Sequence, residues 1–123
     1  MSRKILIAED EAFIASLFKT ELAGHNTEVD IVGNGQEAID AIKKKRYDLI
    51  FLDLLMPEVD GYAVLSYCLE HQIRIPVVVV LTNYGQDMNK KKCRELGAED
   101  FIVKAEVTAD QIWERVKKYL PVE

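Results

Sequence analysis

The chain has 123 residues, about the length of one domain, and its 49% hydrophobic and 30% charged residues are ordinary for a globular protein. A net charge of −5 disfavours non-specific binding to nucleic acid or anionic membranes, and no segment approaches the roughly 18 apolar residues of a membrane span. Cys68 and Cys93 lack the spacing of a metal or redox motif, and we expect both thiols to be reduced. Together these features predict one cytoplasmic domain over residues 1–123.

Short apolar runs alternate with amphipathic stretches along the chain. The apolar runs predict strands at residues 5–8, 28–32, 49–52, 77–81 and 100–103. The amphipathic stretches predict helices from about 11 to a stop at 24, from the turn at 33–35 to 46, and at about 62–71, 86–96 and 108–120. Strands that alternate with helices in this way indicate an α/β fold with a parallel sheet.

The apolar positions also predict which faces are buried. In the first helix, the predicted buried residues are Ile14, Leu17, Phe18 and Leu22. Asp30 lies in the middle of the second strand, which is therefore predicted to be an edge of the sheet. The second helix ends in the cationic run 43–46, where positive charge is favoured by the helix dipole, and we expect this run to be solvated.

Four of the predicted strands end on residues suited to phosphate chemistry. The first ends on Glu9 and Asp10, the third on Asp53, the fourth on Thr82 and the fifth on Lys104. In a parallel sheet the carboxyl ends of the strands lie along one edge, where α/β proteins bind their ligands. We therefore expect these side chains to converge in one crevice that suits a divalent cation and a phosphoryl group.

The chemistry of these residues predicts a role for each. Mg²⁺, with Mn²⁺ as the alternative, prefers oxygen ligands, which Asp10 and Asp53 would supply directly and Glu9 through water. Three acids crowded together without a cation would oppose each other's ionisation. Asp53 follows the most continuously apolar strand next to the metal site and is the better candidate for the nucleophile that accepts the phosphoryl group. Lys104 and Thr82 would then contact the phosphoryl oxygens.

Over essentially its full length, the sequence resembles the receiver domain of two-component response regulators. The resemblance rests on several motifs that occur together: Glu9-Asp10, the segment Asp53-Leu-Leu-Met-Pro57 with Asp60-Gly61, Thr82, and Leu96-Gly97-Ala98 before Phe101-Ile-Val-Lys104. It implies a flavodoxin-like (βα)5 fold, doubly wound, with strand order 2-1-3-4-5.

The resemblance also implies how the site works. Asp53 would take a phosphoryl group from a phosphohistidine of a sensor kinase or a phosphotransfer protein. The Leu55 backbone carbonyl would join Asp10 and Asp53 as a magnesium ligand. Phe101 would be the switch aromatic that turns inward when Thr82 moves.

As a receiver domain, the protein would be a signalling switch and not an enzyme beyond its own phosphotransfer and dephosphorylation. Phosphorylation would alter the face formed by the helix at 86–96, the strand at 100–103 and the helix at 108–120. That face would bind a target protein or a second copy of the chain. With no output domain in the sequence, we expect a stand-alone receiver or a fragment of a longer regulator.

Three positions depart from the family pattern. Ala105 follows Lys104 in place of a proline with a cis peptide; since a cis bond to another residue costs about 2.5–4 kcal/mol, we expect a trans bond here. Asn83, in place of a small residue, is expected to crowd the phosphoryl group or hydrogen-bond it. Leu55 and Tyr84 would flank the path of attacking water and slow hydrolysis of the aspartyl phosphate.

Alternative functions are left open. Gly33-Asn-Gly-Gln-Glu-Ala38 follows a strand and opens a helix, and Asp53 comes 20 residues after Gly33, as in a dinucleotide-binding fingerprint. An aspartyl-phosphate phosphohydrolase of the haloacid dehalogenase type would need an acid two residues after the nucleophile, where this chain has Leu55. A degenerate receiver that only binds partners would not need the full set of site residues.

Overall fold

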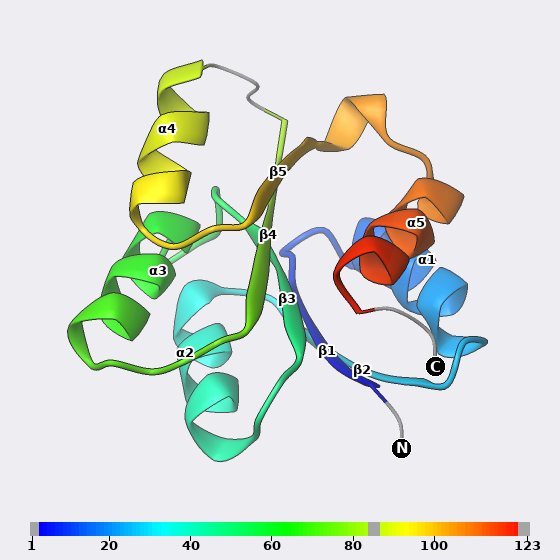
Figure 1. Cartoon of the computed structure of the whole chain (residues 1–123), viewed down its shortest axis with the longest axis horizontal. Helices are drawn as coiled ribbons and strands as arrows, with labels where there is room; N and C mark the ends of the chain where they lie inside the picture. Colours follow the sequence, from blue (N-terminus) through cyan, green and yellow to red (C-terminus); the bar gives the residue numbers. More distant parts are fainter. Residues whose placement is uncertain (1–2, 84–86, 121–123) are drawn as a thin grey trace.

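The computed structural model describes residues 3–83 and 87–120, which form a five-stranded parallel sheet of order β2-β1-β3-β4-β5 between two layers of helices (Figure 1). The strands are β1 Arg3–Ala8, β2 Thr27–Val32, β3 Leu49–Asp53, β4 Val77–Thr82 and β5 Asp100–Val103. The helices are α1 Ala12–Ala23, α2 Gly35–Lys44, α3 Gly61–Glu70, α4 Asp87–Glu95, the short 3-10 helix η1 Lys104–Glu106 and α5 Ala109–Tyr119. The predicted fold class, strand order and edge position of the second strand are confirmed.

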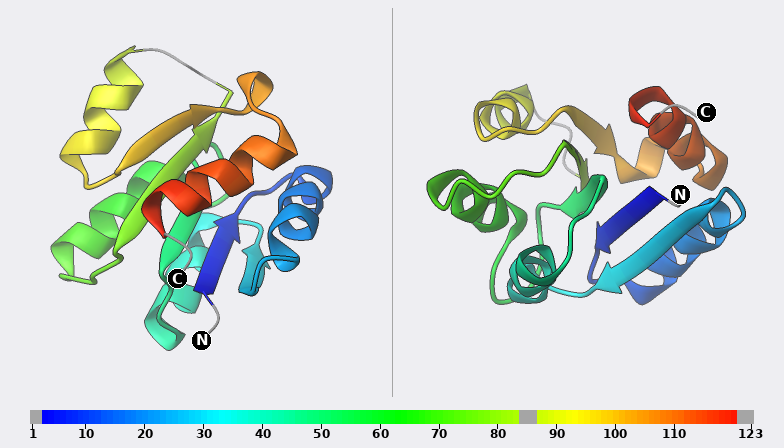
Figure 2. Two further views of the ribbon diagram at one scale, coloured as in Figure 1. Left: turned by 45° about the vertical axis from the view of Figure 1, so that its right-hand side comes forward. Right: turned by 60° about the horizontal axis from the view of Figure 1, so that its bottom comes forward.

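The helices divide between the two faces of the sheet, so that each face has its own hydrophobic core. Helices α1 and α5 cover one face, and α2, α3 and α4 cover the other (Figures 1 and 2). Successive strand residues point to opposite faces: Ile50 packs in the core under α2 and α3, and Phe51 in the core under α1 and α5. A sheet covered on both faces explains why the central strands are continuously apolar.

The pairing of the strands brings their carboxyl ends to the same level. Ala8 at the end of β1 pairs with Leu52, Asp53 at the end of β3 pairs with Leu81, and Thr82 at the end of β4 pairs with Val103. The residues that end these strands or directly follow them are therefore neighbours across the top of the sheet.

Helix α1 buries a slightly different face from the one predicted. Ala15, Phe18 and Leu22 are buried and Ile14 is partly buried, but the Leu17 side chain is 44% exposed. The helix turns about 100° per residue, so Ala15 lies on the same face as Phe18 and Leu22, and Leu17 lies outside that face. The expectation that Leu17 is buried is wrong because it counted large apolar side chains and passed over alanine.

The cationic run 43–46, at the end of α2, is only partly solvated. The Lys45 ammonium lies 2.8 Å from a Glu28 carboxylate oxygen and 3.0 Å from one of Asp30, on edge strand β2. The Tyr47 hydroxyl donates a hydrogen bond of 2.7 Å to Asp30. These contacts explain how an acid is accommodated in the middle of β2, and they correct the prediction that the whole run is solvated.

Two glycines allow a close approach of the backbone below the strand ends. The Gly35 amide, at the start of α2, donates to the Val59 carbonyl oxygen at 2.9 Å, and a Cβ at Gly35 would lie 2.7 Å from the Val59 carbonyl carbon. The Gly61 amide, at the start of α3, donates to the Leu54 carbonyl oxygen at 2.9 Å. The close approach of Gly35 fixes the loop after β3 against α2, and this packing accounts for a glycine of the dinucleotide-like motif.

Cys68 and Cys93 are buried free cysteines, and burial raises the pKa of both thiols. Among the described helices, none combines the length and hydropathy needed to cross a bilayer.

Candidate functional site

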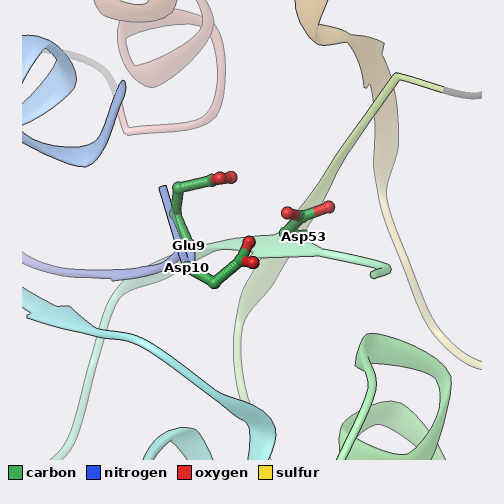
Figure 3. Close-up of side chains that lie close together, drawn as sticks. All are labelled: Glu9, Asp10 and Asp53. Atoms are coloured by element: carbon green, nitrogen blue, oxygen red, sulfur yellow. The ribbon is translucent and has the colours of Figure 1, made fainter. Parts of the chain in front are cut away.

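Three carboxylates meet where β1 and β3 end (Figure 3). Glu9 and Asp10 directly follow β1, and Asp53 is the last residue of β3. One oxygen from each carboxylate lies within 4.8 Å of the others. Glu9 and Asp53 are buried, and Asp10 is exposed. The predicted convergence of these acids is confirmed.

Lys104, which follows β5, lies between the two buried acids. Its ammonium is 3.1 and 3.0 Å from the two Glu9 carboxylate oxygens and 3.0 Å from Asp53 Oδ2. The side chains of Lys104, Glu9 and Asp53 are 6%, 0% and 4% exposed. One ammonium therefore forms ion pairs with two carboxylates, and all three groups are shielded from water. The sequence predicts Lys104 beside Asp53, but the direct Glu9–Lys104 pair is not among its expectations.

Burial raises the pKa of Glu9 and of Asp53, whereas the contacts with Lys104 act to lower both. Burial raises the pKa of Glu9 to about 7 against the lowering effect of its hydrogen bonds from Lys104, and the Asp53 charge adds to the rise. Burial also raises the pKa of Asp53, although Lys104 favours the ionised carboxylate. For Lys104, burial acts to lower the pKa, but the hydrogen bonds to Glu9 and Asp53 outweigh it and the net shift is upward. One lysine therefore compensates only part of the negative charge of these carboxylates.

A hollow of about 200 Å³ opens above these groups. Its walls are Asp10, Glu11, Asp53, Leu55, Thr82, Asn83 and Lys104. Every predicted phosphoryl-contacting residue therefore borders one small space. Glu11 is an addition that the sequence signalled only as the third acid of the run 9–11; its backbone amide donates to Glu9 Oε1 at 3.2 Å.

The loop after β3 holds the Asp53 carboxylate in place. The Leu55 amide donates to Asp53 Oδ1 at 3.3 Å, so the two Asp53 oxygens have different partners, Leu55 on one side and Lys104 on the other. Asp60 caps α3 by accepting from the Ala63 amide at 2.8 Å. The Leu55 side chain is 53% exposed at the border of the hollow, while Tyr84 lies outside the described residues.

Phe101 lies on β5, one strand away from Thr82. It is partly buried against the core on the face covered by α2, α3 and α4, and the Lys90 ammonium of α4 lies 5.8 Å from its ring centroid. Thr82 is buried at the hollow. The bond between Lys104 and Ala105 is trans, as predicted, and Lys104 reaches the acids with that geometry. The switching roles of Thr82 and Phe101 stay predictions.

The geometry supports neither the dinucleotide-binding function nor the phosphohydrolase function. The dinucleotide-like motif follows β2, which is an edge strand. Asp53, the acid that would bind the ribose, is instead hydrogen-bonded to Lys104. The position where a phosphohydrolase needs its second acid carries the apolar Leu55 side chain at the rim of the hollow.

Replacing Asp10 by asparagine is expected to raise the free energy of unfolding by about 1 kcal/mol in the presence of a chelator, because it removes one of three neighbouring negative charges. The variant should also gain less stability than the wild type when magnesium is added. Urea denaturation with EDTA and with magnesium measures both effects. Asp40→Asn, which removes an exposed acid on α2, is the control. An Asp10→Asn protein less stable than wild type in EDTA would contradict the crowding of charge.

Comparison with known proteins agrees with this geometry. The sequence model of the response regulator receiver domain family matches residues 5–117. The chain is 39% identical over 104 residues to the transcriptional regulatory protein SrrA of Staphylococcus aureus; the match covers 85% of this chain but only 42% of that protein. The chain thus spans less than half the length of this curated relative.

Solved structures of receiver domains superpose closely on the chain. The receiver domain of Francisella response regulator 1452 has a TM-score of 0.88 and 27% identity, with 96% of both chains covered. The signal receiver domain of a signal transduction histidine kinase from Syntrophus aciditrophicus has a TM-score of 0.83 and 32% identity, with 99% of this chain and 96% of that chain covered.

Proposed function

Because this chain belongs to the response regulator receiver domain family of two-component signalling, we propose that it is a switch that accepts a phosphoryl group on Asp53. The donor is a phosphohistidine of a sensor kinase or of a phosphotransfer protein. The observation that carries the proposal is the Lys104 ammonium, 3.0 Å from the buried Asp53 carboxylate and beside two further acids. Taken together, these groups suit a reaction in which a carboxylate attacks phosphorus and charge on phosphoryl oxygens must be compensated.

The transfer needs an ionised Asp53 and a fixed direction of attack. A carboxylate oxygen of Asp53 forms a bond to phosphorus while the P–N bond of the donor breaks, and the leaving imidazole regains a proton. Lys104 favours the ionised form of Asp53 and holds one of its oxygens, while the Leu55 amide holds the other. Thr82 and Asn83, which border the same hollow, donate hydrogen bonds to the phosphoryl oxygens.

The donor set at the site fits a magnesium ion, with manganese as the alternative. Asp10, Asp53 and the Leu55 backbone carbonyl would be direct ligands, and Glu9 would act through water. Three carboxylates with oxygens within 4.8 Å, two of them buried and sharing one ammonium, are the hard and electron-rich donors that such an ion prefers. When bound, the ion would neutralise charge on the phosphoryl oxygens.

Phosphorylation would act on the rest of the molecule through Thr82 and Phe101. Thr82 moves toward the phosphoryl group, and Phe101 turns inward and changes the face made by α4, β5 and α5. That face then binds a target protein or a second copy of the chain, without direct contact with nucleic acid or membrane. We place this switch in the cytoplasm, as a stand-alone receiver or as part of a longer regulator.

Incubation with a small phosphodonor and magnesium is expected to add one phosphate to the wild-type protein, and intact mass spectrometry measures it. Asp53→Asn should give no adduct, because the amide is not a nucleophile toward phosphorus. Asp40→Asn removes an acid far from the hollow and should be phosphorylated like the wild type. Omission of magnesium should sharply reduce the adduct. An adduct that persists in Asp53→Asn would contradict the proposal.

A further inference from the structure

A second, larger hollow lies at the amino ends of the strands, whereas Asp53 lies at their carboxyl ends. It has a volume of about 420 Å³ and lies between the end of α2 and the loop that leads from α3 into β4. Figure 1 draws the connection from α2 to β3 at the bottom, at the amino end of β3, whereas Asp53 is at the carboxyl end of the same strand. This hollow therefore has no part in the site described above.

The walls of this hollow are strongly basic. Lys43, Lys44 and Arg46 come from the end of α2 and the segment after it, and Arg74 comes from the loop on the other side. Lys45 also borders the hollow, but it is paired with Glu28 and Asp30. No acid is among the lining residues, and within the part of the chain that the structure describes, the other four cations have no carboxylate within 4.0 Å.

The helix dipole explains only part of this concentration of charge. Cations in the last turn of α2 offset the negative end of its dipole, but Arg74 belongs to a separate loop and makes no such contribution. The protein as a whole carries a net charge of −5. Cations without a carboxylate partner that gather from two segments of an acidic protein create a local positive potential and attract an anion.

Four isoleucines are among the residues that line the hollow. Ile42 and Ile50 are buried there, and Ile73 and Ile75 from the loop before β4 are partly buried. Ile73 and Ile75 leave apolar surface that a flat organic ring would cover, whereas a purely inorganic anion would gain nothing from it. The volume is within the range of small-molecule sites, roughly 300–1,000 Å³.

We propose that this hollow binds a nucleoside di- or triphosphate. The phosphates contact Lys43, Lys44, Arg46 and Arg74, and the base or ribose lies against Ile73 and Ile75. The phosphate chain supplies several negative charges a few ångströms apart, which matches cations presented from two sides. Arginine adds paired donors that suit phosphate oxygens.

Calorimetric titration with ATP in magnesium-free buffer containing EDTA tests the proposal, because the acidic hollow at Asp53 then has no metal with which to hold the nucleotide. Lys44→Glu/Arg74→Glu should weaken ATP binding at least about tenfold. Lys91→Glu/Lys118→Glu makes the same change in net charge with exposed lysines elsewhere and should alter binding by less than about twofold. All four substituted residues are exposed, and circular dichroism checks that both variants fold.

The remaining outcomes each decide the proposal. Chemical-shift changes upon addition of ATP should be centred on residues 42–47 and 72–75. Absence of ATP binding, or an equal loss of binding in both double variants, would overturn it. Tripolyphosphate that binds as tightly as ATP would overturn the nucleoside assignment and leave an inorganic polyphosphate as the ligand. Tighter binding of an acidic peptide would replace it with a polypeptide.

Discussion

Replacing Lys104 by methionine is expected to lower the free energy of unfolding by about 3 kcal/mol in magnesium-free buffer near neutral pH. The variant would leave the Glu9 and Asp53 carboxylates almost fully buried without the ammonium that now lies 3.0 Å from each. Breaking a buried ion pair from one side is costly because the remaining charge has lost its partner but not its burial. Urea denaturation measures the loss.

The size of this loss should depend on pH in a definite direction. The folded protein raises the pKa of Glu9 from 4.5 to about 7, so between these values the folded state binds more protons than the unfolded state, and stability falls as pH rises. Without Lys104 the pKa of Glu9 rises further, so the fall in stability extends to higher pH. The difference between variant and wild type should therefore be small at about pH 5 and large at about pH 8.

Two variants control this experiment. Lys91→Met makes the same substitution at an exposed position of α4 and should leave stability nearly unchanged. Adding Glu9→Gln to Lys104→Met removes one of the two buried charges and should restore part of the loss. A Lys104→Met protein as stable as wild type at about pH 8 would show that the ammonium does not offset the acids.

Replacing Gly61 by alanine is expected to destabilise the protein by about 2 kcal/mol and to slow phosphorylation of Asp53. A Cβ at this position would lie 2.8 Å from Leu54 Cα and closer still to the Asp53 carbonyl oxygen. These are backbone atoms, which cannot rotate away as a flexible side chain could. The loop that carries Asp53 must move, and its carboxylate would lose alignment with Lys104.

The matched control for this prediction is Gly24→Ala. Gly24 follows α1, has a φ of −79° and has nothing within 4 Å of the place where a Cβ would be. The same substitution there should leave stability unchanged or raise it slightly, because alanine restricts the unfolded chain. Denaturation of both variants and their rates of phosphorylation by a small phosphodonor give the comparison. Equal stability of Gly61→Ala and wild type would contradict the close packing beneath Asp53.

The sequence predicts the sheet and the convergence of the site well because both depend on a simple regularity. Strands of a parallel sheet end along one edge, so the residues that follow each apolar run must be neighbours. That reasoning brings Glu9, Asp10, Asp53, Thr82 and Lys104 together without any knowledge of side-chain packing. The edge position of β2 follows in the same way from a single acid, Asp30.

Features that depend on side-chain packing were not predictable from the sequence pattern. Lys104 pairs with Glu9 because both are buried by the surrounding strands and loops, and a pattern of residue types does not contain that burial. Lys45 crosses from the end of α2 to β2, a contact set by the geometry of the connection. The Gly61 contact with the backbone at Asp53 likewise depends on how closely α3 approaches the end of β3.

The location of the acyl phosphate is the most direct test of a site built around Asp53. After incubation with a phosphodonor and magnesium, borohydride reduction converts an aspartyl phosphate to homoserine, and peptide mass mapping identifies the residue. The structure predicts homoserine at position 53 alone, at the carboxylate that Lys104 contacts. Homoserine at Asp10, or a phosphate retained on His25 or His71 with Asp53 unchanged, would contradict it.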